Sequence, residues 1–117
     1  MLAKSARLTE SADFARATKS GLRFSTQNFV GYLYPTTLNQ PARAGLIISK
    51  SVGGSVTRHQ IARKVRHALR EIYPQLPTGG LLVVRALNSA HDADVAQEIT
   101  KIVGQLLKKL SEKANQK

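Results

Sequence analysis

Cationic side chains recur along one stretch of the sequence at the spacing of a helix face. At about 100° per residue, a group of them falls on one side of a helical wheel: His59, Arg63, Arg66, His67 and Arg70. Like charges at such spacings repel by a few tenths of a kcal/mol per pair, and no acidic residue follows before Glu71. Guanidinium groups offer planar pairs of donors that match phosphate oxygens. The one-sided face therefore favours contact with a polyanion over the alternative, a surface that only keeps the helix soluble.

Residues that could catalyse a reaction are scarce. A nuclease that works through its side chains needs clustered carboxylates for metal ions, or a pair of acid and base groups. The 7 acidic residues are scattered, and of the 3 histidines His59 and His67 fall on the cationic face, where contact with a polyanion is a simpler role than metal binding. The absence of cysteine excludes disulfides and cysteine-based zinc sites. We expect no catalytic residue and no metal ligand among the side chains.

The charge of the chain is strongly unbalanced. Its 117 residues include 18 Lys and Arg against 7 Asp and Glu, a formal net charge of +11, and no acid occurs in residues 15–70. The candidate partners are therefore nucleic acid and an acidic membrane surface. No apolar run approaches the roughly 18 residues of a membrane span, and no secretory signal is evident, so we expect a cytoplasmic protein without a membrane partner. The length predicts a single domain over residues 1–117, with a mobile basic arm at 1–8 and a mobile polar tail at 111–117.

The first half of the chain predicts one helix and a pair of strand segments. The helix is expected over about residues 10–19, after Thr9 as N-cap and before Gly21. Strand-like residues follow over 22–34 and 42–49. Because a short polar turn separates these two segments, we expect them to form an antiparallel pair.

The second half predicts two helices around a buried strand. The central helix has an apolar stripe opposite its cations: Ile61, Val65, Ala68, Leu69 and Ile72. The continuously apolar run over 81–85 predicts a strand that is buried on both faces. The last helix, with Ser89 or Asp92 as its cap, repeats apolar residues at helical spacing: Val95, Ile99, Ile102, Val103, Leu106 and Leu110.

The central segment carries a family resemblance. Residues 49–72, SKSVGGSVTRHQIARKVRHALREI, resemble the signature of the bacterial ribonuclease P protein component, approximately K-x-[VI]-G-x-A-V-x-R-N-R-x-K-R-x-x-R. His59, Gln60 and Ala62 depart from it, where the family has Asn, Arg and Lys. The order of elements on both sides agrees with the family as well. The positions in register with the signature are Lys50, Val52, Gly53, Val56, Arg58, Ile61, Arg63 and Arg66.

This resemblance implies the protein subunit of ribonuclease P, which removes the 5′ leader from precursor tRNA. It implies that the catalytic RNA subunit performs the chemistry with bound Mg²⁺. No obligatory protein partner is evident from the sequence. The residues expected to bind the catalytic RNA are Lys50, Arg58, His59, Arg63, Arg66 and Arg70.

A second set of residues is expected to bind the leader: Phe14, Arg16 and Tyr34. The resemblance implies that Phe14 lines a cleft for single-stranded RNA, although an aromatic at such a position is also typical of a core. Thr18 stands where the family has a second aromatic. Tyr32 and Tyr34 share one face of their strand by period two. The alternative function is a structural ribosomal or RNA-chaperone protein, which a basic helix would serve equally well; a helix-turn-helix protein is disfavoured because no second helix lies nearby.

The expected fold is an α+β single-domain, two-layer α/β sandwich with the element order α-β-β-β-α-β-α, similar to that of ribosomal proteins. Strand, helix and strand in succession imply a crossover between parallel strands. The general rule for such crossovers predicts a right-handed connection, whereas the family resemblance implies the uncommon left-handed form.

Overall fold

A computed structural model describes residues 8, 11–36, 39–90 and 94–114 of the chain. Its elements follow the expected order, and short 3-10 turns at Lys50–Val52 and Tyr73–Gln75 flank the central helix. The predicted N-cap, Thr9, lies outside the described residues. The helices and strands are α1 (Ser11–Ser20), β1 (Leu22–Ser25), β2 (Phe29–Tyr34), β3 (Arg43–Ile47), α2 (Ser55–Ile72), β4 (Leu81–Ala86) and α3 (Val95–Ala114).

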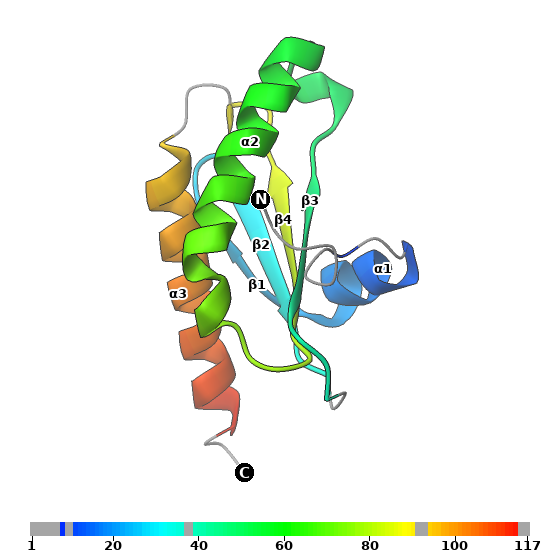
Figure 1. Cartoon of the computed structure of the whole chain (residues 1–117), viewed down its shortest axis with the longest axis vertical. Helices are drawn as coiled ribbons and strands as arrows, with labels where there is room; N and C mark the ends of the chain where they lie inside the picture. Colours follow the sequence, from blue (N-terminus) through cyan, green and yellow to red (C-terminus); the bar gives the residue numbers. More distant parts are fainter. Residues whose placement is uncertain (1–7, 9–10, 37–38, 91–93, 115–117) are drawn as a thin grey trace.

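The strands form one sheet in the order β1-β2-β4-β3 (Figure 1). β2 pairs antiparallel with both β1 and β4, whereas β3 and β4 are parallel. The predicted antiparallel pair of 22–34 and 42–49 is wrong. Residues 22–34 fold back on themselves, with a turn in which the Thr26 N–H donates to the Phe29 carbonyl at 2.8 Å, and β4 separates β2 from β3. β4 occupies this central position because its side chains are apolar on both faces, apart from the exposed Arg85.

The crossover from β3 through α2 to β4 is left-handed. In Figure 1, β3 rises, α2 descends in front of the sheet, and β4 rises again to the left of β3. This is the form implied by the family resemblance, and it is the rare one among parallel crossovers.

Helices cover both faces of the sheet. α2 and α3 pack side by side on one face, and the shorter α1 lies on the other, where it adds a partial third layer (Figure 1). The apolar stripe predicted for α2 is buried, as are the periodic residues of α3 up to Leu106. Gly31 permits close packing of α3 on β2, because a Cβ at this position would overlap the Ile102 side chain. The larger core therefore lies between the sheet and the α2–α3 layer.

Asp94 caps α3. Its Oδ1 accepts a hydrogen bond from the Gln97 N–H at 3.3 Å, an N-cap arrangement. Of the two predicted caps, Ser89 instead donates to the Gln27 carbonyl at 3.4 Å, and Asp92 lies outside the described residues. At its other end α3 continues through residues 111–114, part of the predicted tail. Within the described ranges, none of the helices combines the length and the hydropathy that a bilayer crossing requires.

Glu98 joins the first turn of α3 to the β1–β2 hairpin. Its carboxylate accepts hydrogen bonds from Thr26 Oγ1 at 2.6 Å, from the Asn28 N–H at 3.0 Å and from Asn28 Nδ2 at 2.6 Å. Burial raises the pKa of this carboxyl, but the hydrogen bonds from Asn28 and Thr26 outweigh it, so that the pKa lies below the ordinary value of 4.5. The ionised form of Glu98 therefore stabilises the fold.

Candidate nucleic-acid interface

The cationic residues of α2 form a continuous exposed surface, here called the α2 basic face: His59, Arg63, Arg66, His67 and Arg70. Each of them is solvent-exposed, and Lys64 is exposed on the flank. Among the described residues, no carboxylate forms an ion pair with any of these cations. The prediction that these side chains share one exposed side of the helix is thus confirmed. A helix that buries one stripe must present the opposite side to solvent.

A groove of about 730 Å³ runs along this surface, lined in part by Val56, Arg63 and Arg66. Val56 is 71% exposed, which is unusual for a large apolar side chain in the described part of the chain. Two of the departures from the family signature, His59 and Gln60, also line the groove. The α2 basic face therefore offers apolar contact as well as charge.

Arg58 lies between the α2 basic face and the end of β3. It lines a second groove of about 270 Å³ between α2 and the end of β3, which His59 and Arg66 also line. Its Nε atom is buried and has no hydrogen-bond partner among the described residues. The third departure, Ala62, lies in the same groove and is 8% exposed. Lys50 is exposed on the 3-10 turn before α2, so the expected RNA-binding cations extend around the start of the helix.

The expected leader-binding residues lie on the opposite face of the sheet, where α1 carries Phe14 and Arg16 and β2 carries Tyr34. Phe14 and Tyr34 are half-buried and pack against the smaller core cluster, which includes Tyr32 and Leu81. A Cβ at Gly45 would lie 2.5 Å from Phe14 Cζ, so the ring rests directly on the backbone of β3. Phe14 therefore packs partly in the core, which was the alternative to leader binding, but it remains partly accessible to solvent.

Period two placed Tyr32 and Tyr34 on one face, and the structure confirms this. Tyr32 is only 9% exposed, which leaves Tyr34 as the accessible tyrosine. Thr18 is half-buried, and its hydroxyl donates to the carbonyl oxygens of Phe14 at 3.0 Å and Ala15 at 3.2 Å. The aromatic part of this surface is thus reduced to Phe14 and Tyr34.

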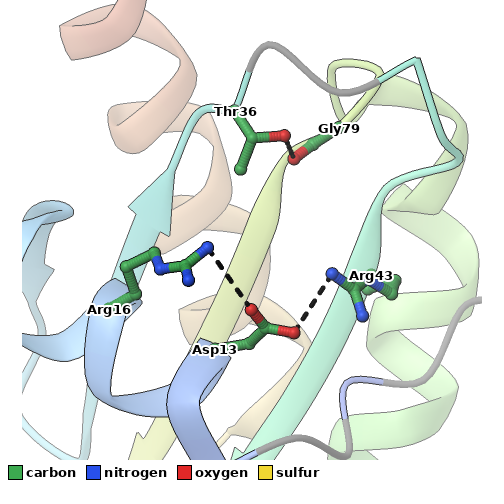
Figure 2. A network of polar contacts seen from close by, with 5 residues as sticks. All are labelled: Asp13, Arg16, Thr36, Arg43 and Gly79. Carbon is green, nitrogen blue, oxygen red and sulfur yellow. Dashed lines mark hydrogen bonds and ion pairs between the residues drawn. The ribbon is translucent and has the colours of Figure 1, made fainter.

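Charged residues border these aromatics where α1 meets β3 (Figure 2). The Asp13 carboxylate lies 3.7 Å from Arg16 Nη1 and 3.2 Å from Arg43 Nη2. Sequence reasoning did not find the ion pair of Asp13 with Arg43, because an ion pair between a helix and a distant strand leaves no local pattern. The α1-side face consists of Phe14, Arg16, Tyr34, Asp13 and Arg43.

The predicted residues thus fall into two groups, separated by the sheet. Lys50 and Arg58 extend the α2 basic face, whereas Phe14, Arg16 and Tyr34 gather on the α1 side. The described residues contain no group of three or more His, Cys, Asp or Glu side chains able to hold a metal ion. The third histidine, His91, lies outside the described residues.

Known proteins are similar to this chain in both sequence and fold. A family model described as Ribonuclease P matches residues 2–111. The ribonuclease P protein component of Streptomyces avermitilis is 41% identical over 105 residues, covering 83% of this chain and 85% of the relative. That of Streptomyces griseus is 42% identical over 105 residues, with the same coverage. A solved structure of the Staphylococcus aureus RNase P protein has a TM-score of 0.72 at 28% identity, covering 90% of this chain and 94% of that chain.

These matches span most of the chain, including α1, the whole sheet and α2. They decide between the two functions that a basic helix left open, in favour of a ribonuclease P subunit over a ribosomal or RNA-chaperone protein. The chain belongs to the ribonuclease P protein family, as a protein component of that ribonucleoprotein endoribonuclease.

Proposed function

We propose that the α2 basic face, with Lys50 and Arg58, binds the catalytic RNA of ribonuclease P, and that the α1-side face binds the 5′ leader of precursor tRNA. The observation that carries the first assignment is the absence, among the described residues, of any ion pair to the cations of α2. These side chains keep their donors for an external anion, and each phosphate that they neutralise adds salt-sensitive affinity.

The two surfaces suit two kinds of RNA. The α2 basic face is long and exposed and carries a groove, so it fits the phosphate backbone of a folded RNA, which proteins recognise by shape and charge. The α1-side face combines accessible aromatic edges, Phe14 and Tyr34, with the cation Arg16. Such a combination fits a single strand, whose unpaired bases stack on aromatic rings. A precursor tRNA leader is a strand of this kind.

We place the Mg²⁺ ions of the reaction on the RNA subunit. The arginines of the α2 basic face are hydrogen-bond donors only, and their positive charge repels divalent cations. The same charge lowers the repulsion between the catalytic RNA and its RNA substrate when the two approach each other. The protein would therefore act where both partners are present, in the cytoplasm.

Reconstitution tests the whole proposal. Cleavage of a leader-bearing precursor tRNA at low Mg²⁺ should require both a bacterial ribonuclease P RNA and this protein, and the protein alone should be inactive. If the protein bound the RNA without raising cleavage, the proposed role in the reaction would be rejected.

A paired substitution tests the α2 basic face. Arg63→Ala with Arg66→Ala should lower the slope of log affinity against log salt by about 1.5, because two phosphate contacts are lost. The matched control is Lys101→Ala with Lys108→Ala, which removes the same charge from exposed positions of α3. Equal slopes for the two double variants would contradict the assignment, and circular dichroism checks that both remain folded.

A further inference from the structure

The Asp13 carboxylate bridges two arginines that come from different elements. Oδ1 faces Arg16 of α1 at 3.7 Å and Oδ2 faces Arg43 of β3 at 3.2 Å, so that the three side chains span β4 (Figure 2). The Asp13 side chain is 14% exposed, that of Arg43 23% and that of Arg16 52%. An ion pair to a half-exposed arginine contributes little stability, so the contact with Arg16 does little for the fold.

We infer that Asp13 is a positioning residue, which holds Arg16 and Arg43 so that both guanidinium groups bind one backbone phosphate of the RNA strand on the α1-side face. The inference rests on the proposed function, in which that strand is the 5′ leader. It adds a phosphate site to a surface that otherwise offers aromatic contacts, and it assigns Arg43 a direct role.

Arg43 is fixed at its backbone as well as at its guanidinium group. Its N–H donates to the Gly80 carbonyl at 2.9 Å, and the neighbouring Gly79 N–H donates to the Gln40 carbonyl at 2.7 Å. Thr36 Oγ1 donates to the Gly79 carbonyl at 2.7 Å (Figure 2). A side chain that is already ordered in the free protein loses less entropy when it binds a ligand.

The strand register places Arg43 level with Tyr34, two strands away across the sheet. Tyr34 is opposite Leu81 in the pairing of β2 with β4, and Leu81 is opposite Arg43 in the pairing of β4 with β3. All three side chains point to the α1 side, and two strand spacings of about 4.8 Å separate Tyr34 from Arg43. A base on the Tyr34 ring and a phosphate on the arginines can therefore belong to the same short stretch of one strand.

The carboxylate leaves most donors of the pair free for a phosphate. A guanidinium has five N–H donors, and Asp13 faces one terminal nitrogen of each arginine. The trio retains a net charge of +1, since two cations surround one anion. Without the carboxylate, the two guanidinium groups would repel each other and separate. A bound phosphate would then have to bring them together at an entropic cost.

The decisive test uses the sign of an effect. Asp13→Asn removes a negative charge from an RNA-binding surface, so electrostatics alone would raise affinity. Positioning predicts the opposite: in the reconstituted holoenzyme, affinity for a precursor tRNA with a long leader should fall about tenfold, the loss expected for one charge-assisted hydrogen bond. Affinity for a precursor with a one-nucleotide leader should not change. Equal or higher affinity of Asp13→Asn for the long leader would overturn the inference.

Glu112→Gln is the matched control. It removes the same charge from an exposed position of α3, away from both surfaces, and it should leave leader affinity unchanged or slightly higher. If the wild-type holoenzyme itself bound long and short leaders equally, the failure would lie in the proposed leader site, and the inference would fall with it. Wild-type discrimination that survives in Asp13→Asn would reject the inference alone.

A double-mutant cycle with Arg43→Gln separates positioning from a structural role. If Asp13 acts through Arg43, the loss of leader affinity in the double variant should be clearly smaller than the sum of the two single losses. Each single variant should also lower the salt slope of leader-dependent binding by about 0.7, the value for one phosphate on a single strand. A purely structural role would lower thermal stability without changing this slope. Additive losses, or an unchanged slope, would overturn the inference.

Discussion

The α2 basic face and the α1-side face are assembled in different ways. The first comes from consecutive turns of one helix, so that its three arginines and two histidines are adjacent once residues 59–70 are helical. The second combines residues of α1, β2 and β3, which meet only when β4 has entered the sheet between β2 and β3. The α2 basic face therefore depends on local structure and the α1-side face on the complete tertiary fold.

Because of this difference, substitutions that disturb tertiary packing should affect the two surfaces unequally. Loss of tertiary packing should remove the α1-side face first, because its geometry depends on contacts such as that of Phe14 with Gly45. The α2 basic face needs its helix and the apolar stripe beneath it, which packs in the larger core. Binding of the catalytic RNA should therefore be more tolerant of substitutions than binding of the leader.

The largest effect is expected from Gly45→Val. A Cβ at position 45 would lie 2.5 Å from Phe14 Cζ and 3.1 Å from Leu8 Cβ. Overpacking of this kind should lower the free energy of unfolding by about 2–3 kcal/mol and displace α1 from the sheet. Chemical denaturation measures the stability, and leader-dependent affinity should fall more than affinity for the catalytic RNA. A uniform loss of both affinities would contradict the comparison.

Gly104→Ala is a control for the glycine substitution itself. Apart from the two chain neighbours and the backbone of α3 itself, no described atom lies within 4 Å of a Cβ at this exposed position. Replacing a glycine inside a helix by alanine should raise the free energy of unfolding by about 1 kcal/mol. Neither RNA-binding surface should change.

The next largest effect is expected from Glu98, which joins α3 to the β1–β2 hairpin and so stabilises the fold that both surfaces share. The pKa of Glu98 is lower in the folded protein than in the unfolded chain, so its contribution is present above the ordinary value of 4.5 and is lost as the pH falls through the folded value. Glu98→Gln should reduce the free energy of unfolding by about 1–2 kcal/mol at pH 7. It should also flatten the decline of stability below pH 5. An unchanged acid profile would show that the hydrogen bonds to Thr26 and Asn28 contribute nothing net.

The sequence predicted the local features of this protein well. The order of the elements, the buried stripe of α2 and its exposed cations all follow from periodicity, which is a property of consecutive residues. Tyr32 and Tyr34 were placed on one face for the same reason. The family resemblance added the left-handed crossover, which the general rule for parallel strands would have predicted with the wrong hand.

The sequence could not predict which strands are neighbours. β2 and β3 are adjacent in the chain, and a short connection favours an antiparallel hairpin, but the apolar strand β4 occupies the position between them. The ion pairs of Asp13 depend on this arrangement, because they need the register of β3 against β4 and the docking of α1. No local pattern in the sequence relates Asp13 to Arg43, and their contact became visible only in the fold.

Thr18→Phe should strengthen leader binding at the α1-side face. The family places a second aromatic at this position, whereas the Thr18 hydroxyl here binds the carbonyl oxygens of its own helix. A ring that stacks on one more base should strengthen leader binding by about 1 kcal/mol, or roughly fivefold. Stacking is not an ionic contact, so the salt slope should stay constant. Thr18→Ala, which removes the hydroxyl and the methyl group without adding a ring, is the control, and an equal gain in both variants would contradict stacking.

Gln60→Arg is the counterpart on the α2 basic face and should have the smallest effect. Gln60 is exposed and lines the groove with Arg63 and Arg66, so an arginine there can reach the same RNA backbone. It should steepen the salt slope for the catalytic RNA by about 0.7–0.9, one additional phosphate, and leave leader discrimination unchanged. Gln60→Leu retains the side-chain bulk without the charge and should leave the slope as it is. A steeper slope for the leader instead of the catalytic RNA would mean that the two surfaces share one RNA partner, because a charge added on one side of the sheet should be felt there alone.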